Sequence, residues 1–221
     1  MTSLERVARP AEHVAPRSSV EPGTAALDAA MSRYAEGHDP AFNEIFNGLA
    51  PRLHKFLQRL CGSPELAHDL IQETFLRIHR ARGSFVPGNP VVPWAYAIAR
   101  NCFVSHARSP KTKAARTNLD ISDHEVAAGA EANAEEAATA RQSAEIVERT
   151  LAGMSAINRE AFVLLRFEGQ SVAAAAQILG TSEGAVKLRA FRAYECLRAA
   201  LKATELGVSE EPSRNRRDTE A

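Results

Sequence analysis

The segment most informative about the fold is SVAAAAQILGTSEGAVKLRAFRAYECLRAAL, residues 171–201. Ser171 precedes a short apolar run that ends at Gly180, and Ser182 precedes a much longer amphipathic run. Serine is a common residue just before a helix, and glycine is common just after one. A short helix, a tight turn with glycine and a long helix predict a helix-turn-helix motif, which places its second helix in the major groove of DNA.

The long helix of this motif is expected to have two different faces. At about 100° per residue, one apolar stripe forms its predicted core face: Val186, Ala190, Ala193, Leu197 and Leu201. Basic residues on the opposite face are often merely solvated, but exposed Leu188 and Phe191 beside cations need a partner. Such groups can meet base edges, thymine methyls and phosphates. The predicted DNA-contacting residues of this segment are Ser182, Gly184, Lys187, Leu188, Phe191 and Arg192.

Residues 40–108, nearer the N-terminus, also show helical periodicity. Asp39 and Ser63 each stand before a proline, a pairing of a capping side chain with a residue favoured at the first helical position. Gly62 ends the first of these helices, and a third helix follows the loop 84–92 and runs to about residue 108. These signals predict a compact three-helix unit.

The predicted fold is all-α, because no segment shows the alternating pattern of a strand bounded by turn residues. We expect two small helical domains, a three-helix unit and a helix-turn-helix unit, joined by a flexible acidic linker. The predicted boundaries are a disordered arm over 1–22, a first domain over 23–108, the linker over 109–145, a second domain over 146–203 and a disordered tail over 204–221. The Ala/Glu-rich end of the linker, residues 131–141, has the composition of a helix.

The formal net charge of zero hides a strong segregation along the chain. Residues 41–117 carry 11 basic and 4 acidic side chains, and residues 149–202 carry 8 and 4. The intervening residues 118–148 carry 1 basic and 8 acidic side chains. Two basic segments around an acidic one predict a polyanion that is contacted at two places, although two solvated domains with a solvated spacer would show the same counts.

Length and composition exclude several classes of protein. The chain has 221 residues, 45% of them hydrophobic, which suits a folded chain with one ordinary domain or two small ones. No apolar run is long enough to cross a membrane, and the first twenty residues lack the apolar core of a secretory signal. Three widely spaced cysteines indicate the reducing cytoplasm rather than a disulfide framework. We found no metal motif, no phosphate-binding loop and no nucleophile–base pair, so we expect no cofactor, no metal, no small-molecule substrate and no enzymatic activity.

Several sequence strings, in their order and spacing, resemble a known protein family. In the first helical unit they are AFNE (41–44), APRL (50–53), DLIQETFL (69–76) and PWAYAIARN (93–101). In the second they are INREAF (157–162), EGQS (168–171) and ILGTSEGAVK (178–187). The chain is similar to the small extracytoplasmic-function (ECF) subgroup of bacterial sigma factors, with regions 2 and 4 and only a linker between them. The resemblance covers roughly residues 40–108 and 148–202.

The resemblance implies that the second helix of the first unit docks on core RNA polymerase. The residues that match this role are Asp69, Leu70, Gln72, Glu73 and Phe75. Leu70 and Phe75 are also compatible with a place in the core, whereas the three polar side chains are expected on the outer face.

The resemblance also implies that the third helix and the loop before it bind the minus-ten element of the promoter as a single strand. Extruding a base costs a few kcal/mol, part of which a binding pocket returns. Asn101 can pair with a base edge, with Ser105 one turn on, and Arg100, His106 and Arg108 can hold phosphates. Trp94 is more simply explained as a core residue than as a stacking platform.

The helix-turn-helix then corresponds to the part of region 4 that binds the minus-thirty-five element as a duplex. This chain departs from the family pattern in three places: residues 172–176 read VAAAA where acidic residues are usual, Leu188 stands where a small residue is commoner, and Tyr194 stands where an arginine is commoner. The implied partners are core RNA polymerase, promoter DNA and an anti-sigma factor, with no insertion into a membrane. The acidic linker is a tether or a mimic of nucleic acid, and the alternative function is a stand-alone helix-turn-helix regulator that binds operator DNA.

Overall fold

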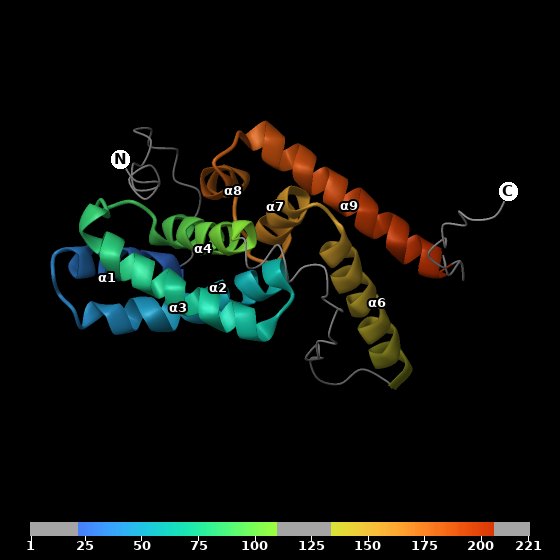
Figure 1. Ribbon diagram of the computed structural model, residues 1–221, viewed down its shortest axis with the longest axis horizontal. Coiled ribbons are helices and arrows are strands. Elements are labelled where there is room, and N and C mark those ends of the chain that lie inside the picture. Colours follow the sequence, from blue (N-terminus) through green and yellow to red (C-terminus); the bar gives the residue numbers. More distant parts are fainter. Residues whose placement is uncertain (1–21, 110–133, 206–221) are drawn as a thin grey trace, which may run out of the picture.

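The computed structural model describes residues 22–109 and 134–205, and every regular element in these ranges is helical (Figure 1). The predicted arm, most of the predicted linker and most of the predicted tail lie outside the described residues. The first part contains the α-helices α1 (Pro22–Ala35), α2 (Ala41–Cys61), α3 (Pro64–Ala81) and α4 (Val91–Arg108), with a 3-10 turn at Arg82–Ser84. The second contains α6 (Ala134–Gly153), α7 (Ala156–Arg166), α8 (Val172–Leu179) and α9 (Glu183–Glu205). The predicted all-α fold is confirmed for the described residues.

The turn between α2 and α3 has the capping residues that the sequence predicts. Gly62 adopts a left-handed conformation, with φ of 71°, and its N–H donates to the carbonyl of Gln58. The Ser63 hydroxyl accepts from the N–H of Leu66, and Pro64 is the first residue of α3. Asp39 does not cap α2 as expected: its carboxylate pairs with Arg82 at 2.6 Å, and Pro40 takes the capping position without a side-chain bond.

The structure adds a helix, α1, to the three that the sequence predicts in the first unit. Its buried residues Ala30, Met31 and Tyr34 pack against α2 and α4. The Asp28 carboxylate accepts a hydrogen bond of 2.7 Å from the N–H of Val91, the first residue of α4. An apolar spacing over residues 27–34 signals this helix, but the neighbouring proline-rich residues conceal it in a sequence survey.

The second unit packs α6 and α7 against the last helix, α9. A small core forms where Leu151 of α6, Phe162 of α7, and Ala193 and Leu197 of α9 meet. Helix α6 begins at Ala134, inside the segment predicted as linker, because alanine and glutamate favour a helix there.

The two units lie against each other. Helix α8 contacts α4, and α7 contacts α2. Figure 1 shows α8 beside α4. One continuous cluster of buried apolar residues includes Tyr96 of α4 together with Leu164 of α7 and Ile178 of α8. Helices α1 to α4 therefore share this core with α7, α8 and the start of α9. None of the helices within the described ranges is long and apolar enough to cross a membrane.

Candidate functional site

The helix-turn-helix is held by two serine caps and one glycine. The hydroxyl of Ser171 accepts from the N–H of Ala174 at 3.1 Å, and that of Ser182 accepts from the N–H of Ala185 at 3.3 Å. Gly180 closes α8 in the left-handed region, with φ of 60°, which a residue with a side chain rarely adopts. These local bonds set the turn after which α9 begins.

The predicted division of α9 into two faces is confirmed by burial. Val186 and Ala193 are fully buried and Leu197 nearly so, whereas Leu188 and Phe191 are 50% and 60% exposed. The remaining predicted contact residues, Ser182, Gly184, Lys187 and Arg192, are exposed as well. Tyr194, half exposed, extends this surface and is the large side chain that stands where the family pattern has a cation. The site presents cations beside apolar groups, which suits a major groove with its phosphates and thymine methyls.

The predicted minus-ten residues on α4 do not all have the same surroundings. Ser105 and Arg108 are exposed, and Asn101 and His106 are half-buried. Arg100 differs from these, because its Nε donates a hydrogen bond of 2.7 Å to the Glu160 carboxylate of α7. The sequence alone does not reveal this partner, which lies sixty residues away along the chain.

The aromatic residues of the first unit are mainly structural. Trp94 is half-buried and packs edge-on against Phe85, with ring centroids 5.2 Å apart, in agreement with a core role. Tyr96 is fully buried, and its hydroxyl donates to Glu168 at 2.7 Å. Burial, followed by the negative charge of Glu168 and the hydrogen bond to it, raises the pKa of the Tyr96 phenol above its usual value. Val86, in the loop before α4, is 48% exposed and is the loop residue that offers an apolar surface to a ligand.

The predicted polymerase-docking residues on α3 divide into surface and core. Asp69 and Gln72 are exposed and Glu73 is half-buried. Leu70 and Phe75 are only 4% and 5% exposed, because they fall on the same stripe as the buried Ile71 and Ile78. In this structure Leu70 and Phe75 support the surface from beneath, and their direct contact with the polymerase stays a prediction.

Two of the polar residues on α3 have neighbours on their own helix that the sequence survey missed. The Glu73 carboxylate pairs with Arg77 at 2.7 Å, four residues on. The Gln72 amide lies 3.0 Å from the His68 ring nitrogen. Pairs at this spacing stabilise an exposed helix by a few tenths of a kcal/mol, so these two side chains have a local role whatever partner they bind.

An apolar surface that the sequence survey did not identify lies beside these residues. Phe46 of α2 is 44% exposed and Leu76 of α3 is 50% exposed. The Phe46 ring packs on Phe75, with centroids 4.7 Å apart. A shallow depression of about 550 Å³ adjoins them, lined by Tyr34, Asp39, Phe42, Gln72, Phe75, Leu76 and His79. Exposed aromatic and aliphatic groups next to polar ones are typical of a protein-binding surface.

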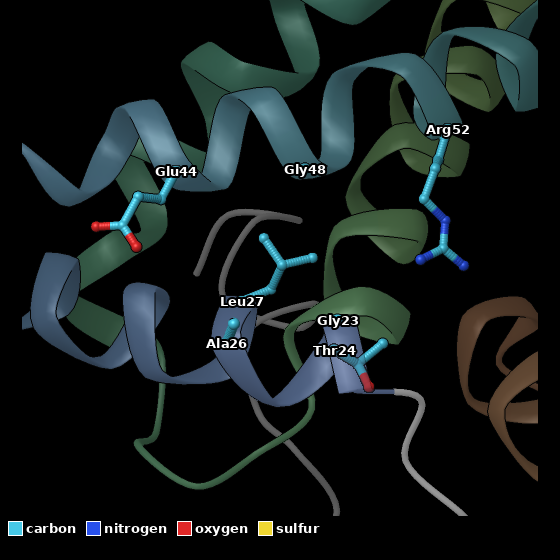
Figure 2. Close-up of a pocket in the computed structure, with 7 residues that line it drawn as sticks. All are labelled: Gly23, Thr24, Ala26, Leu27, Glu44, Gly48 and Arg52. Atoms are coloured by element: carbon cyan, nitrogen blue, oxygen red, sulfur yellow. The ribbon is translucent and has the colours of Figure 1, made fainter.

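A second hollow, of about 310 Å³, lies between α1 and α2 (Figure 2). Figure 2 shows Glu44 and Arg52 at its opposite ends, with Leu27 and Gly48 between them. A Cβ atom at Gly48 would lie 2.5 Å from a Leu27 methyl, so glycine permits the close approach of α1. Glu44 is bound to Arg33 at 2.7 Å, and we interpret the hollow as a packing groove. Within residues 22–109 and 134–205, no group of three or more His, Cys, Asp or Glu side chains is placed to hold a metal ion.

These features define a class of protein. Two helical regions occur in one chain, and the second contains a helix-turn-helix whose outer face is exposed. The first presents polar and apolar groups on α2 and α3. Such an arrangement is that of a multi-region transcription protein.

Comparison with known proteins identifies the family. The sequence matches Sigma-70 region 2 over residues 45–112 and Sigma-70 region 4 over residues 144–197. It is 34% identical over 182 residues to the RNA polymerase sigma factor CarQ of Myxococcus xanthus, covering 81% of this chain and 99% of that protein. It is 30% identical over 180 residues to the ECF RNA polymerase sigma factor SigF of Caulobacter vibrioides, covering 81% and 96%. The chain belongs to the ECF sigma factors, and its function is to direct promoter-specific initiation of transcription; a stand-alone regulator is not favoured.

The solved structures that resemble this one include two complexes. The first is the sigma factor RpoE in complex with the anti-sigma factor NepR from Bartonella quintana, with a TM-score of 0.61, 26% identity and coverage of 73% of this chain and 96% of that one. The second is CnrH in complex with the cytosolic domain of CnrY, with a TM-score of 0.60, 26% identity and coverage of 80% and 98%.

Proposed function

We propose that residues 23–108 bind core RNA polymerase and the melted minus-ten element, and that residues 146–203 bind the minus-thirty-five element as a duplex. The protein performs no chemistry itself, and the polymerase catalyses transcription. The observation that carries this proposal is the presence of both region matches, in this order, on helices whose polar contact residues are largely at the surface. The site of action is then the cytoplasm, where the polymerase and the genome are.

The polymerase-docking surface in this proposal is the outer face of α3 together with the edge of α2. Asp69, Gln72 and Glu73 supply polar groups, and Phe46 and Leu76 supply exposed apolar area. Leu70 and Phe75 fix this surface from below through their packing in the core. Buried apolar area supplies most of the affinity of such an interface, and the surrounding polar groups supply much of its specificity.

The minus-ten surface consists of α4 and the loop before it. Asn101 pairs with the edge of an extruded base and Ser105 assists, while His106 and Arg108 hold the backbone. Arg100 joins them once its guanidinium is released from Glu160. Val86 and the Phe85–Trp94 pair shape the loop side of this surface.

The minus-thirty-five surface is the N-terminal half of α9. Lys187 and Arg192 bind guanine acceptors or phosphates, and Leu188 and Phe191 contact thymine methyls. Ser182 and Gly184 let the start of the helix approach the DNA backbone, where helix N–H groups favour phosphate.

The segment 109–145 serves as a tether in this proposal. An anti-sigma factor is the further partner, because one structural relative quoted above, RpoE, is a sigma factor in complex with an anti-sigma factor.

Run-off transcription with core polymerase on a library of genomic fragments tests the proposal. Addition of the protein is expected to yield discrete transcripts from a subset of fragments, each with a common sequence near positions −10 and −35. If the protein binds DNA fragments but never co-elutes with core polymerase and yields no transcripts, the stand-alone regulator is the better description.

A further inference from the structure

The exposed face of α9 carries a row of three large apolar side chains. Leu188, Phe191 and Tyr194, which together we call the apolar ridge, are each at least half exposed. Successive members are three residues apart, so they are neighbours on the surface of the helix. A single exposed apolar residue needs no explanation, but a contiguous row marks a binding surface.

Cations flank the apolar ridge on both sides. At about 100° per residue, Lys187 lies to one side of the first two ridge members and Arg192 lies to the other. Both cations are exposed, and neither takes part in an ion pair among residues 22–109 and 134–205. The next acid along this face, Glu195, is paired with Arg198 at 2.8 Å. The unpaired cations therefore belong to the N-terminal half of the helix, beside the ridge.

This arrangement matches the major groove of DNA. The floor of the groove is formed by base edges, and the phosphates of the two strands border it on either side. Six residues of helix cover about 9 Å, so the ridge spans between two and three base-pair steps of about 3.4 Å. A helix that rests its apolar ridge on the floor directs Lys187 and Arg192 toward opposite strands.

The chemistry of the ridge decides which base edges it can face. The side chains of Leu188 and Phe191 have no group that donates or accepts a hydrogen bond. Against a purely polar base edge they would displace water and leave the base without a partner, which is costly. Thymine is the standard base that presents a methyl group in the major groove, and an apolar side chain buries that methyl favourably.

We propose that the apolar ridge reads the minus-thirty-five element through pyrimidine methyl groups. At the bases that face Leu188 and Phe191, specificity depends on the C5-methyl of thymine and not on the hydrogen-bond pattern of the base pair. Cytosine methylated at C5 carries the same methyl group and is accepted at these positions. Tyr194 continues the ridge toward the wall of the groove. The inference rests on the proposed function, which places α9 at the minus-thirty-five element.

The test measures the affinity of the holoenzyme, core polymerase loaded with this protein, for a responsive promoter whose bases are changed one at a time. Deoxyuridine in place of a thymine removes the methyl and nothing else. At one or two thymines of the minus-thirty-five element it is expected to weaken binding about fourfold, since a buried methyl is worth about 0.8 kcal/mol. A cytosine–guanine pair at the same position should also bind more weakly, and 5-methylcytosine should bind about fourfold better than cytosine there.

Protein variants show whether the ridge is what senses the methyl. Leu188→Ala and Phe191→Ala should each weaken binding to the unmodified promoter, and each should abolish the response to deoxyuridine at one thymine. Ile157→Ala, at a similarly exposed apolar position on α7, is the matched control and should keep the fourfold response. Circular dichroism and affinity for core polymerase should be unchanged in both ridge variants, because their side chains are exposed.

The proposal is overturned if no thymine of the element responds to deoxyuridine, if 5-methylcytosine binds no better than cytosine at a responsive position, or if the two ridge variants keep the full response. A holoenzyme that protects the minus-thirty-five element from DNase but ignores removal of the methyl groups leaves the proposed function in place and rejects this inference. A protein that forms no holoenzyme, or whose holoenzyme never protects that element, rejects both.

Discussion

Asn101 and Arg100 are neighbours on α4, but their surroundings differ. Arg100 is engaged by Glu160, whereas Asn101 is half-buried beside the exposed part of the helix. A side-chain amide in this position can donate to and accept from the same base edge. Asn101 is therefore the residue of α4 on which base recognition is tested.

We expect Asn101→Ala to reduce open-complex formation by about tenfold or more, since a good side-chain contact to a base edge discriminates by about 1–3 kcal/mol. Affinity for core polymerase should not change. Permanganate footprinting of the holoenzyme on a responsive promoter measures the first quantity, and size-exclusion chromatography with core measures the second. Asn47→Ala, at an exposed position of α2, is the control. Loss of core binding in the Asn101 variant would show that the residue is structural.

Tyr96 makes the stability of the protein depend on pH in the alkaline range. Because its pKa is raised above the usual 10.0, the folded protein keeps a phenolic proton that the unfolded chain has lost. Burial likewise raises the pKa of the Cys61 and Cys102 thiols above 9.0. The folded state thus binds more protons in this range, and its stability is fully present below pH 9 and falls as pH rises.

The free energy of unfolding should therefore decline above pH 9, and more steeply above pH 10, by up to about 1.4 kcal/mol per pH unit for each group. Tyr96→Phe is expected to make the decline above pH 10 shallower, after an initial loss of about 1 kcal/mol at neutral pH for the missing hydrogen bond. Urea unfolding between pH 7 and 11 measures both effects. Tyr194→Phe, at an exposed tyrosine, should retain the wild-type slope; an equal change in both variants would remove Tyr96 as the cause.

At the scale of single elements, α3 and α9 carry the two proposed contact surfaces whose polar residues are mostly exposed. On α3, Glu73 is paired with Arg77 and Gln72 is next to His68, so substitution of either also disturbs the helix. Asp69 is exposed and is the cleaner position for a variant.

Asp69→Lys is expected to lower the affinity for core polymerase by about tenfold or more, because charge reversal at a complementary interface adds repulsion to the loss of an attraction. Helicity and the unfolding midpoint should stay close to those of the wild type. Fluorescence anisotropy of labelled protein titrated with core gives the affinity, with Glu145→Lys on α6 as the control. A large fall in stability in the Asp69 variant, with a matching fall in binding, would assign the residue a structural role instead.

On α9, the proposal distinguishes a phosphate contact from a surface cation. If Arg192 binds one phosphate, Arg192→Ala should weaken promoter binding and flatten the plot of log affinity against log salt concentration by about 0.9. Lys202→Ala, an exposed cation at the far end of the same helix, should leave this slope unchanged. Binding of the holoenzyme to a responsive promoter between 50 and 200 mM salt, as order-of-magnitude limits, gives the slopes. An unchanged slope for Arg192→Ala would place its side chain away from the backbone.

Local signals determine how much of these elements the sequence predicts. The buried and exposed faces of α9 can be predicted from the helical spacing of its apolar residues. The turn between α2 and α3 can be predicted from Gly62, Ser63 and Pro64. Helix α1 is harder to predict, because its apolar residues are few and adjoin a proline-rich stretch. The pairs of Arg100 with Glu160 and of Arg59 with Glu168 are not predictable from local pattern at all, since each joins residues brought together only by tertiary packing.

For the molecule as a whole, the packing of the second unit against the first determines which predicted contact residues are exposed and which are already paired. Asp69 and Gln72 on α3 and the outer face of α9 are exposed, whereas Arg100 on α4 is paired with the second unit. The basic character that the sequence assigns to residues 41–117 is thus partly neutralised within the fold, by acids contributed from residues 149–202. The charge along the chain indicates a polyanionic ligand. The fold determines which of the cations are already paired with acids of the same chain.

The shared core also predicts how the protein unfolds. A cluster of buried residues that includes Phe56 of α2, Tyr96 of α4 and Leu164 of α7 couples the units, so the wild type should unfold in one cooperative transition, with equal calorimetric and van't Hoff enthalpies. In the Glu160→Lys, Glu168→Lys variant the coupling is lost and two transitions are expected, while the Glu145→Lys, Glu148→Lys control keeps one. Differential scanning calorimetry at neutral pH measures this. Two transitions in the wild type would mean that the two units are only loosely associated in spite of the shared cluster.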